Sequence, residues 1–222
     1  MPTIAQSYIE DLTDLIFEQI SEYMSIKKDA ELIREHFEKR VTKKQFSNFQ
    51  AFYFRTINQR NSFHSSKNFF REFKNNYSLQ GVDDKYLKHL ETNKKKILSL
   101  IDDGKLSELY FSYFFKIKIG SVKKDFGSFF TKLIHHFMPD RYCQVDIPMR
   151  SYFKLIHESY FIAFIVISGA FKMWAEKNSM RMKRMKRLVV TIIKKNQWQY
   201  DNITDMKILN IIFWSVSNPI KI

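Results

Sequence analysis

The position of one carboxylate, Asp146, is suited to chemistry. It lies between Val145 and Ile147, and Pro148 is typical of the first turn of a helix that we expect to run through Ile156. A carboxylate there is poorly solvated yet close to the positive end of a helix dipole. That setting can tune a base or stabilise a cation. The alternative is a structural N-cap, because Asp is a preferred capping residue.

The surrounding segment resembles the part of the helix-hairpin-helix base-excision DNA glycosylases that carries their catalytic aspartate. The resemblance lies within residues 117–175 and rests on four features: a helix over 129–137, the Pro139-Asp140 turn, the Val145-Asp146 dipeptide and an arginine, Arg150. It implies a glycosylase-like C-terminal part in which Asp146 stabilises the sugar cation or activates water. The excised base would be flipped into an aromatic pocket.

The chain departs from this family at two positions. The family's Gly-x-Gly hairpin corresponds to Ile119-Gly120-Ser121-Val122, which lacks the second glycine, and the lysine nucleophile of the lyase-type members corresponds to Gly127 or Ser128. The resemblance therefore implies a monofunctional, hydrolytic glycosylase, or a glycosylase-like fold reused for binding.

Arg150 and His157 form a second candidate catalytic pair. Their Arg-x6-His spacing resembles the active-site motif of the all-α HEPN ribonucleases, in which two such pairs meet across a dimer. Seven residues are two turns of a helix, so both side chains would project from one face. This hypothesis is an alternative to base excision.

Several side chains of metal-binding type lie in the same segment. They are His135, His136, Asp140, Asp146, His157 and Glu158. Adjacent helical residues point about 100° apart, so His135 and His136 cannot both bind one ion without distortion. The single cysteine, Cys143, excludes an intramolecular disulfide and a CxxC zinc site. We therefore expect no metal site and no cofactor.

The densest charge lies in residues 172–195, which hold nine basic residues and one acid, Glu176. The basic residues are Lys172, Lys177, Arg181, Lys183, Arg184, Lys186, Arg187, Lys194 and Lys195. Apolar residues keep helical spacing among them, namely Met182, Met185, Val189, Ile192 and Ile193. Such a helix can pack on a core and present its cations to phosphates. The alternatives are an anionic membrane surface, an acidic protein and a merely solvated helix.

The net charge of +14 is unevenly distributed, because residues 1–26 contain five acids and no Lys or Arg. We expect a first, acidic helix that contacts a protein partner or folds back over the basic face. Its predicted apolar face comprises Ile4, Tyr8, Leu12, Leu15, Ile16 and Ile20.

Alternating strand patterns are almost absent, which predicts an all-α protein of roughly eight to eleven helices. One helix is predicted to begin near Thr42, and another to run from Asp83 through Ile101. The Asp102-Asp103-Gly104 break suggests an N-terminal lobe, 1–103, and a C-terminal lobe, 104–222, with a single domain as the alternative. The helically spaced phenylalanines between residues 46 and 73 are expected in the core, although exposed rings could stack on bases.

The apolar run 160–170 is too short to span a bilayer and predicts a buried helix. The acidic start of the chain does not resemble a signal peptide, so we expect a cytoplasmic protein. The sequence thus favours a protein that acts on nucleic acid, with DNA favoured over RNA. We expect a glycosylase-like enzyme; the alternatives are a non-catalytic binding subunit of a larger complex, such as a defence complex, and a HEPN-like ribonuclease.

Overall fold

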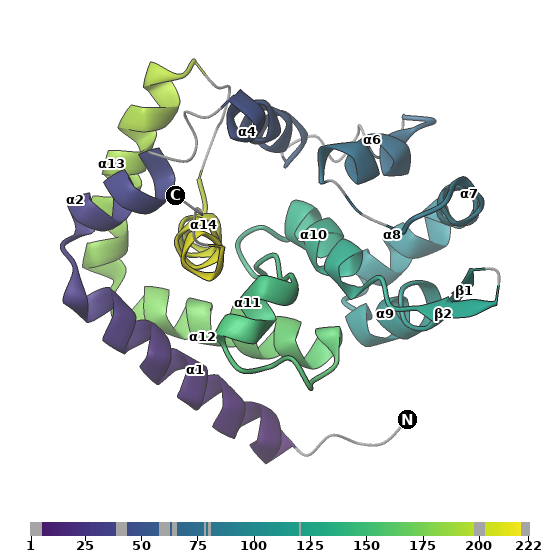
Figure 1. The fold of residues 1–222 in the computed structure, drawn as a ribbon, viewed down its shortest axis with the longest axis horizontal. Coiled ribbons are helices and arrows are strands. Elements are labelled where there is room, and N and C mark those ends of the chain that lie inside the picture. Colours follow the sequence, from purple (N-terminus) through teal and green to yellow (C-terminus); the bar gives the residue numbers. More distant parts are fainter. Residues whose placement is uncertain are drawn as a thin grey trace.

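The computed structural model describes residues 6–38, 44–57, 63, 66–77, 79, 81–119, 121–197 and 203–218, with the backbone alone at 44–50 and 119. Its helices are α1 (Gln6–Ile26), α2 (Asp29–Leu32), the π-helix η1 (Ile33–Glu38), α4 (Lys44–Ile57), α6 (Phe69–Asn76), α7 (Asp84–Thr92), α8 (Lys94–Asp102), α9 (Leu106–Tyr113), α10 (Gly127–Phe137), α11 (Ile147–Tyr152), α12 (Tyr160–Lys177), α13 (Ser179–Lys195) and α14 (Asp205–Ser217). Two short strands, β1 (Ile117–Ile119) and β2 (Val122–Lys124), pair antiparallel between α9 and α10. The expected all-α class is confirmed (Figure 1).

Helix α14 is enclosed on several sides. Eight successive residues, from Met206 to Phe213, are buried, because α11, α12, α13 and η1 all pack against it. The C-terminal helix is therefore surrounded by segments from distant parts of the sequence (Figure 1).

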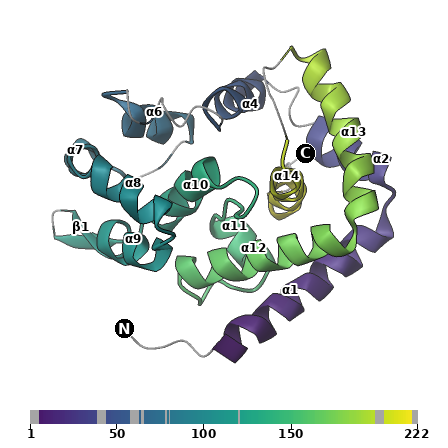
Figure 2. The same cartoon turned by 180° about the vertical axis from the view of Figure 1, so that it is seen from behind.

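The acidic helix α1 packs along α12, which both views of the ribbon show (Figures 1 and 2). Ile16 and Ile20 are buried as expected, but Tyr8 and Leu15 are 41% and 60% exposed, so that part of the predicted face is wrong. The buried residues of α1 are Ile16, Ile20 and Met24, so the buried face is rotated toward Met24, and Thr13 lies close to Gly169 of α12.

The phenylalanine-rich segment contributes to the core wherever its side chains are described. Buried aromatic residues from it are Phe52, Tyr53, Phe54, Phe63, Phe69, Phe70 and Phe73. Phe73 stacks on Phe129 of α10, with ring centroids 5.4 Å apart and planes 13° apart. Burial of the rings confirms the core interpretation over base stacking. The predicted helix start at Thr42 and the side chains of Phe46 and Phe49 lie outside the described parts.

Three local expectations need correction. The helix predicted from Asp83 does begin there, with the Asp83 side chain accepting from the Tyr86 amide, but it divides into α7 and α8 at Asn93. The helix expected to run through Ile156 ends at Tyr152. The two ends of the segment compared with the glycosylase hairpin, Ile119 and Val122, pair across β1 and β2 rather than joining two helices. Strands of three residues are too short to leave a recognisable alternating pattern.

The apolar run 160–170 forms the first part of α12 and lies in the core, as predicted. Among the described helices, none combines the length and apolar character needed to cross a bilayer. Buried apolar side chains on both sides of Asp103 belong to one hydrophobic cluster. The division into lobes at that residue stays a prediction.

Candidate functional site

Asp146 is the N-cap of α11. Its Oδ1 accepts a hydrogen bond from the Met149 amide at 3.1 Å, and its Oδ2 accepts one from the Trp214 indole Nε1 at 3.0 Å. The capping alternative is therefore the one found. Both oxygens take part in the fold, since one caps α11 and the other ties α11 to α14.

Arg150 holds the loop that follows α11. The side chain is buried, and its guanidinium donates to the carbonyl oxygens of Leu155, Ile156 and Glu158. The guanidinium carbon also lies 4.2 Å from the centroid of the Tyr160 ring. These donors satisfy carbonyl oxygens of the loop after α11, so the contacts are structural.

His157 does not share a helix face with Arg150. Helix α11 ends at Tyr152, and Lys154 takes a left-handed conformation with φ 58° that turns the chain. His157 is exposed beyond this turn while Arg150 is buried. The expectation that both residues project from one helix is wrong, because the helix ends five residues before His157.

The basic segment forms the end of α12 and the whole of α13. All five apolar residues predicted to face the core, Met182, Met185, Val189, Ile192 and Ile193, are buried. The amphipathic interpretation of this helix is thus confirmed.

Three cations of α13 bind acids of neighbouring elements. Asp29 of α2 pairs with both Arg181 and Arg184, and Asp205 of α14 pairs with Lys186 at 3.0 Å. The N-terminal region therefore does reach the basic helix, but through Asp29 rather than through the acids of α1. The acids of α1, which are Glu10, Asp11, Asp14, Glu18 and Glu22, are all exposed.

Three other cations of α13, Lys183, Arg187 and Lys194, form an exposed row that we call the α13 stripe. Successive helical residues are rotated by about 100°, which places these three within about 40° of one another. In the described part of the chain, none of the three forms an ion pair. Lys195 is exposed on another side of the helix.

The two basic residues of α12 differ from the stripe. Lys172 lies 3.9 Å from Glu176, and the Lys177 ammonium lies 4.3 Å from the centroid of the Phe17 ring in α1. Both are tied to neighbouring groups, so the uncommitted charge of the basic segment is concentrated on α13.

A buried tyrosine–histidine pair in the core was not foreseen from the sequence. His135 Nδ1 lies 2.6 Å from the carbonyl oxygen of Tyr142, and His135 Nε2 lies 2.6 Å from the hydroxyl of Tyr53. A carbonyl only accepts, so Nδ1 carries the proton and Tyr53 donates to Nε2. Burial lowers the pKa of His135 to about 3, which keeps the ring neutral.

His136 forms a parallel pair with Tyr77. The Gln144 amide donates to the Tyr77 oxygen at 2.8 Å, so the Tyr77 hydroxyl donates to His136 Nε2. The other ring nitrogen faces Thr56 Oγ1 at 3.4 Å. Burial again lowers the pKa of the histidine and raises that of the tyrosine.

Lys207 of α14 is buried beside this network. Its ammonium lies 3.7 Å from the centroid of the Tyr53 ring, and burial lowers its pKa to about 7. The sequence signal was a lysine immediately before the mostly apolar run 208–214, which Asn210 interrupts. That signal was missed because only the fold shows that α14 is covered on several sides.

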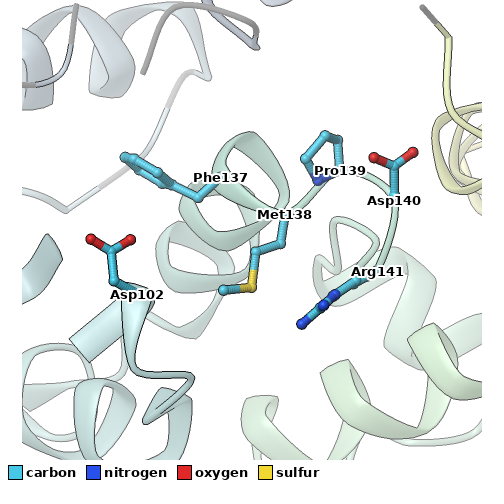
Figure 3. Close-up of a pocket in the computed structure, with 6 residues that line it drawn as sticks. All are labelled: Asp102, Phe137, Met138, Pro139, Asp140 and Arg141. Atoms are coloured by element: carbon cyan, nitrogen blue, oxygen red, sulfur yellow. The ribbon is translucent and has the colours of Figure 1, made fainter. Parts of the chain in front are cut away.

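A surface pocket of about 500 Å³ opens between the ends of α8 and α10 (Figure 3). It is lined by Asp102, Phe137, Met138, Pro139, Asp140 and Arg141. The two carboxylates come from different elements, and Met138 points between them (Figure 3). Asp146, Arg150 and His157 are not among its lining residues, so the structure does not bring the predicted catalytic groups to this pocket.

Within the described ranges, no three His, Cys, Asp or Glu side chains are grouped so as to hold a metal ion. The thiol of Cys143 is buried against Ser168, and burial raises its pKa to about 12. It therefore stays protonated at neutral pH and is a poor nucleophile.

Comparison of the chain with models of protein families, with curated proteins and with solved structures gave no match. The functional argument therefore depends on the geometry of the chain's own residues.

Proposed function

We propose that this protein is a non-catalytic nucleic-acid-binding protein that holds the phosphate backbone of duplex DNA with the α13 stripe. One observation carries the proposal: Lys183, Arg187 and Lys194 project from the exposed side of a helix whose apolar side is buried.

The length of the stripe suits a polyanion. From Lys183 to Lys194 the helix rises by about 16 Å, at 1.5 Å per residue. Phosphates of one B-form strand follow one another at about 3.4 Å along the axis, so the stripe is about five phosphates long. Contacts of lysine and arginine with phosphate give affinity without base choice.

A membrane surface fits α13 less well. A helix that lies in a bilayer interface inserts a broad apolar face, and here that face is already covered by the core. The exposed large apolar residues on α13 are Met180 and Leu188, which are too few for such a face.

Base excision by Asp146 is the alternative within the same class of function. An excision carboxylate must face the sugar of the substrate. Both Asp146 oxygens accept hydrogen bonds from within the chain, which favours a binding role for the protein.

The proposal is tested with a triple variant of the stripe, Lys183→Gln/Arg187→Gln/Lys194→Gln, and a fluorescent 20-base-pair duplex. Loss of three phosphate contacts should weaken binding by about two orders of magnitude at 0.1 M salt. The control is Lys67→Gln/Arg141→Gln/Lys154→Gln, which removes the same charge from exposed sites on other elements. Equal affinities for the two variants would contradict the proposal.

A further inference from the structure

The β1–β2 hairpin carries an unfavourable pair of like charges. Lys118 of β1 lies directly opposite Lys123 of β2 in the antiparallel register, and both side chains are exposed. Like charges directly opposite one another destabilise a strand pair, and a hairpin of two short strands is marginal by itself. Neither the packing of the hairpin nor its stability accounts for two lysines at these positions.

The two lysines lie on the outer face of the hairpin. Side chains alternate along a strand, and Ile117, the neighbour of Lys118, packs against the core. Lys124, opposite Ile117, reaches toward the Gly81 carbonyl oxygen at 3.5 Å. Lys118 and Lys123 therefore project away from the protein. We call these two residues the hairpin pair.

The carboxylates that follow the hairpin and those that follow Gly81 are engaged elsewhere. Asp125 accepts from the Tyr110 hydroxyl and the Gly127 amide, both at 2.8 Å. Asp83 caps α7, and Asp84 pairs with Arg71 at 3.3 Å. In the described part of the chain, no acid forms an ion pair with the hairpin pair.

Helix α7 adds exposed lysines near the hairpin. Helix α7 lies beside the hairpin in both views (Figures 1 and 2). Lys124 of β2 contacts the carbonyl oxygen of Gly81, which lies three residues before the start of α7. Lys85 and Lys88 of α7 are exposed. Exposed ammonium groups on long, flexible stems suit a repeated anion such as a phosphate backbone, rather than one small ligand that needs an enclosed site.

We infer that the hairpin pair is a second contact for the DNA backbone, and that one molecule bridges two duplex segments. The hairpin and α13 lie at opposite ends of the molecule along its longest axis (Figures 1 and 2). The inference rests on the proposed function of α13, because bridging needs both surfaces.

The test uses two 10-base-pair duplexes, one with a donor and one with an acceptor fluorophore. Each is about 34 Å long, whereas a folded chain of 222 residues is about 45 Å across, so neither duplex spans both ends. The natural chain should give energy transfer between the duplexes. Lys118→Gln/Lys123→Gln should abolish the transfer, and Arg141→Gln/Lys154→Gln, with the same loss of charge, should retain it.

The outcomes separate the two proposals. Transfer that is unchanged in Lys118→Gln/Lys123→Gln, or absent in the natural chain, overturns the inference and leaves α13 binding intact. A stripe variant that still binds a single duplex with full affinity overturns the proposed function instead.

Mass photometry must show one protein per bridged complex, since bridging by a protein dimer contradicts the inference. The hairpin variant should melt at the same or a higher temperature, because a repulsion is removed.

Discussion

Lys207 shows how burial changes the chemistry of a single residue. The ammonium is enclosed in α14 beside the Tyr53 ring, and its pKa falls from 10.5 to about 7. Between pH 7 and 10.5 the unfolded chain binds a proton at this site that the folded chain lacks. Stability from this group therefore rises with pH across that window, and the burial penalty is complete below pH 7.

Replacing Lys207 by methionine should remove this penalty. The shift corresponds to a free energy on the order of 5 kcal/mol, so Lys207→Met should raise the free energy of unfolding at pH 7. The gain should shrink as the pH approaches 10. Urea unfolding of both proteins from pH 7 to 10 measures it, and a gain that does not depend on pH would contradict the proposed cause.

Substitutions of Asp146 distinguish a capping role of this residue from a catalytic role. Asparagine is also a good N-cap, so Asp146→Asn should leave DNA affinity unchanged and cost at most about 1 kcal/mol of stability. Asp146→Ala loses the cap and an acceptor for the Trp214 indole, and should cost about 1 to 3 kcal/mol. These losses are measured by urea unfolding. Release of a base from damaged duplex DNA that disappears in Asp146→Asn would instead support an excision enzyme.

At the scale of elements, the contact between α10 and α12 depends on Gly127. A Cβ at this position would lie 2.1 Å from Tyr160 Cβ, so the start of α12 and the start of α10 touch through the missing side chain. Tyr160 also supports the Arg150 guanidinium that holds the loop after α11. Residues of three helices therefore meet at Tyr160.

We expect Gly127→Ala to destabilise the protein by about 3 kcal/mol, because Tyr160 must move. Gly104→Ala is the matched control: it has open space around the added carbon, although its φ of 68° adds about 1 kcal/mol of strain. Thermal unfolding compares the two. If Gly127→Ala proved as stable as Gly104→Ala, the packing at Tyr160 would not be limiting.

Elements with strong periodicity were predictable, and short or enclosed ones were not. Met182, Met185 and Val189 keep helical spacing among charged residues, so the buried side of α13 could be inferred from the sequence alone. The β1–β2 hairpin has only three residues in each strand, which is below the length of a recognisable pattern. The end of α11 depends on Arg150 and on the turn at Lys154, which are tertiary and backbone effects.

The residues of the candidate site also differ in whether the local sequence could predict them. Asp146 at a helix start was predicted, because Asp followed by Pro148 is a local signal. His135 pairs with Tyr53, which is more than 80 positions away in the sequence. Lys207 is buried because several helices cover α14. No local pattern encodes such contacts.

At the scale of the whole molecule, the net charge of +14 resolves into distinct surfaces. The α1 helix exposes five acids, while Asp29 and Asp205 neutralise part of α13. Two groups of exposed basic residues without an ion pair in the described part of the chain, the α13 stripe and the hairpin pair, lie at opposite ends of the molecule (Figure 1). This distribution, rather than the total, is what favours a polyanionic partner.

The most direct test of the central claim is the salt dependence of duplex binding. The logarithm of affinity should fall linearly with the logarithm of salt concentration, by about 0.9 for each phosphate contacted. The stripe variant Lys183→Gln/Arg187→Gln/Lys194→Gln should therefore have a slope shallower than that of the natural chain by about 2.7. Identical slopes for the two proteins would show that α13 does not contact the backbone and would contradict the account.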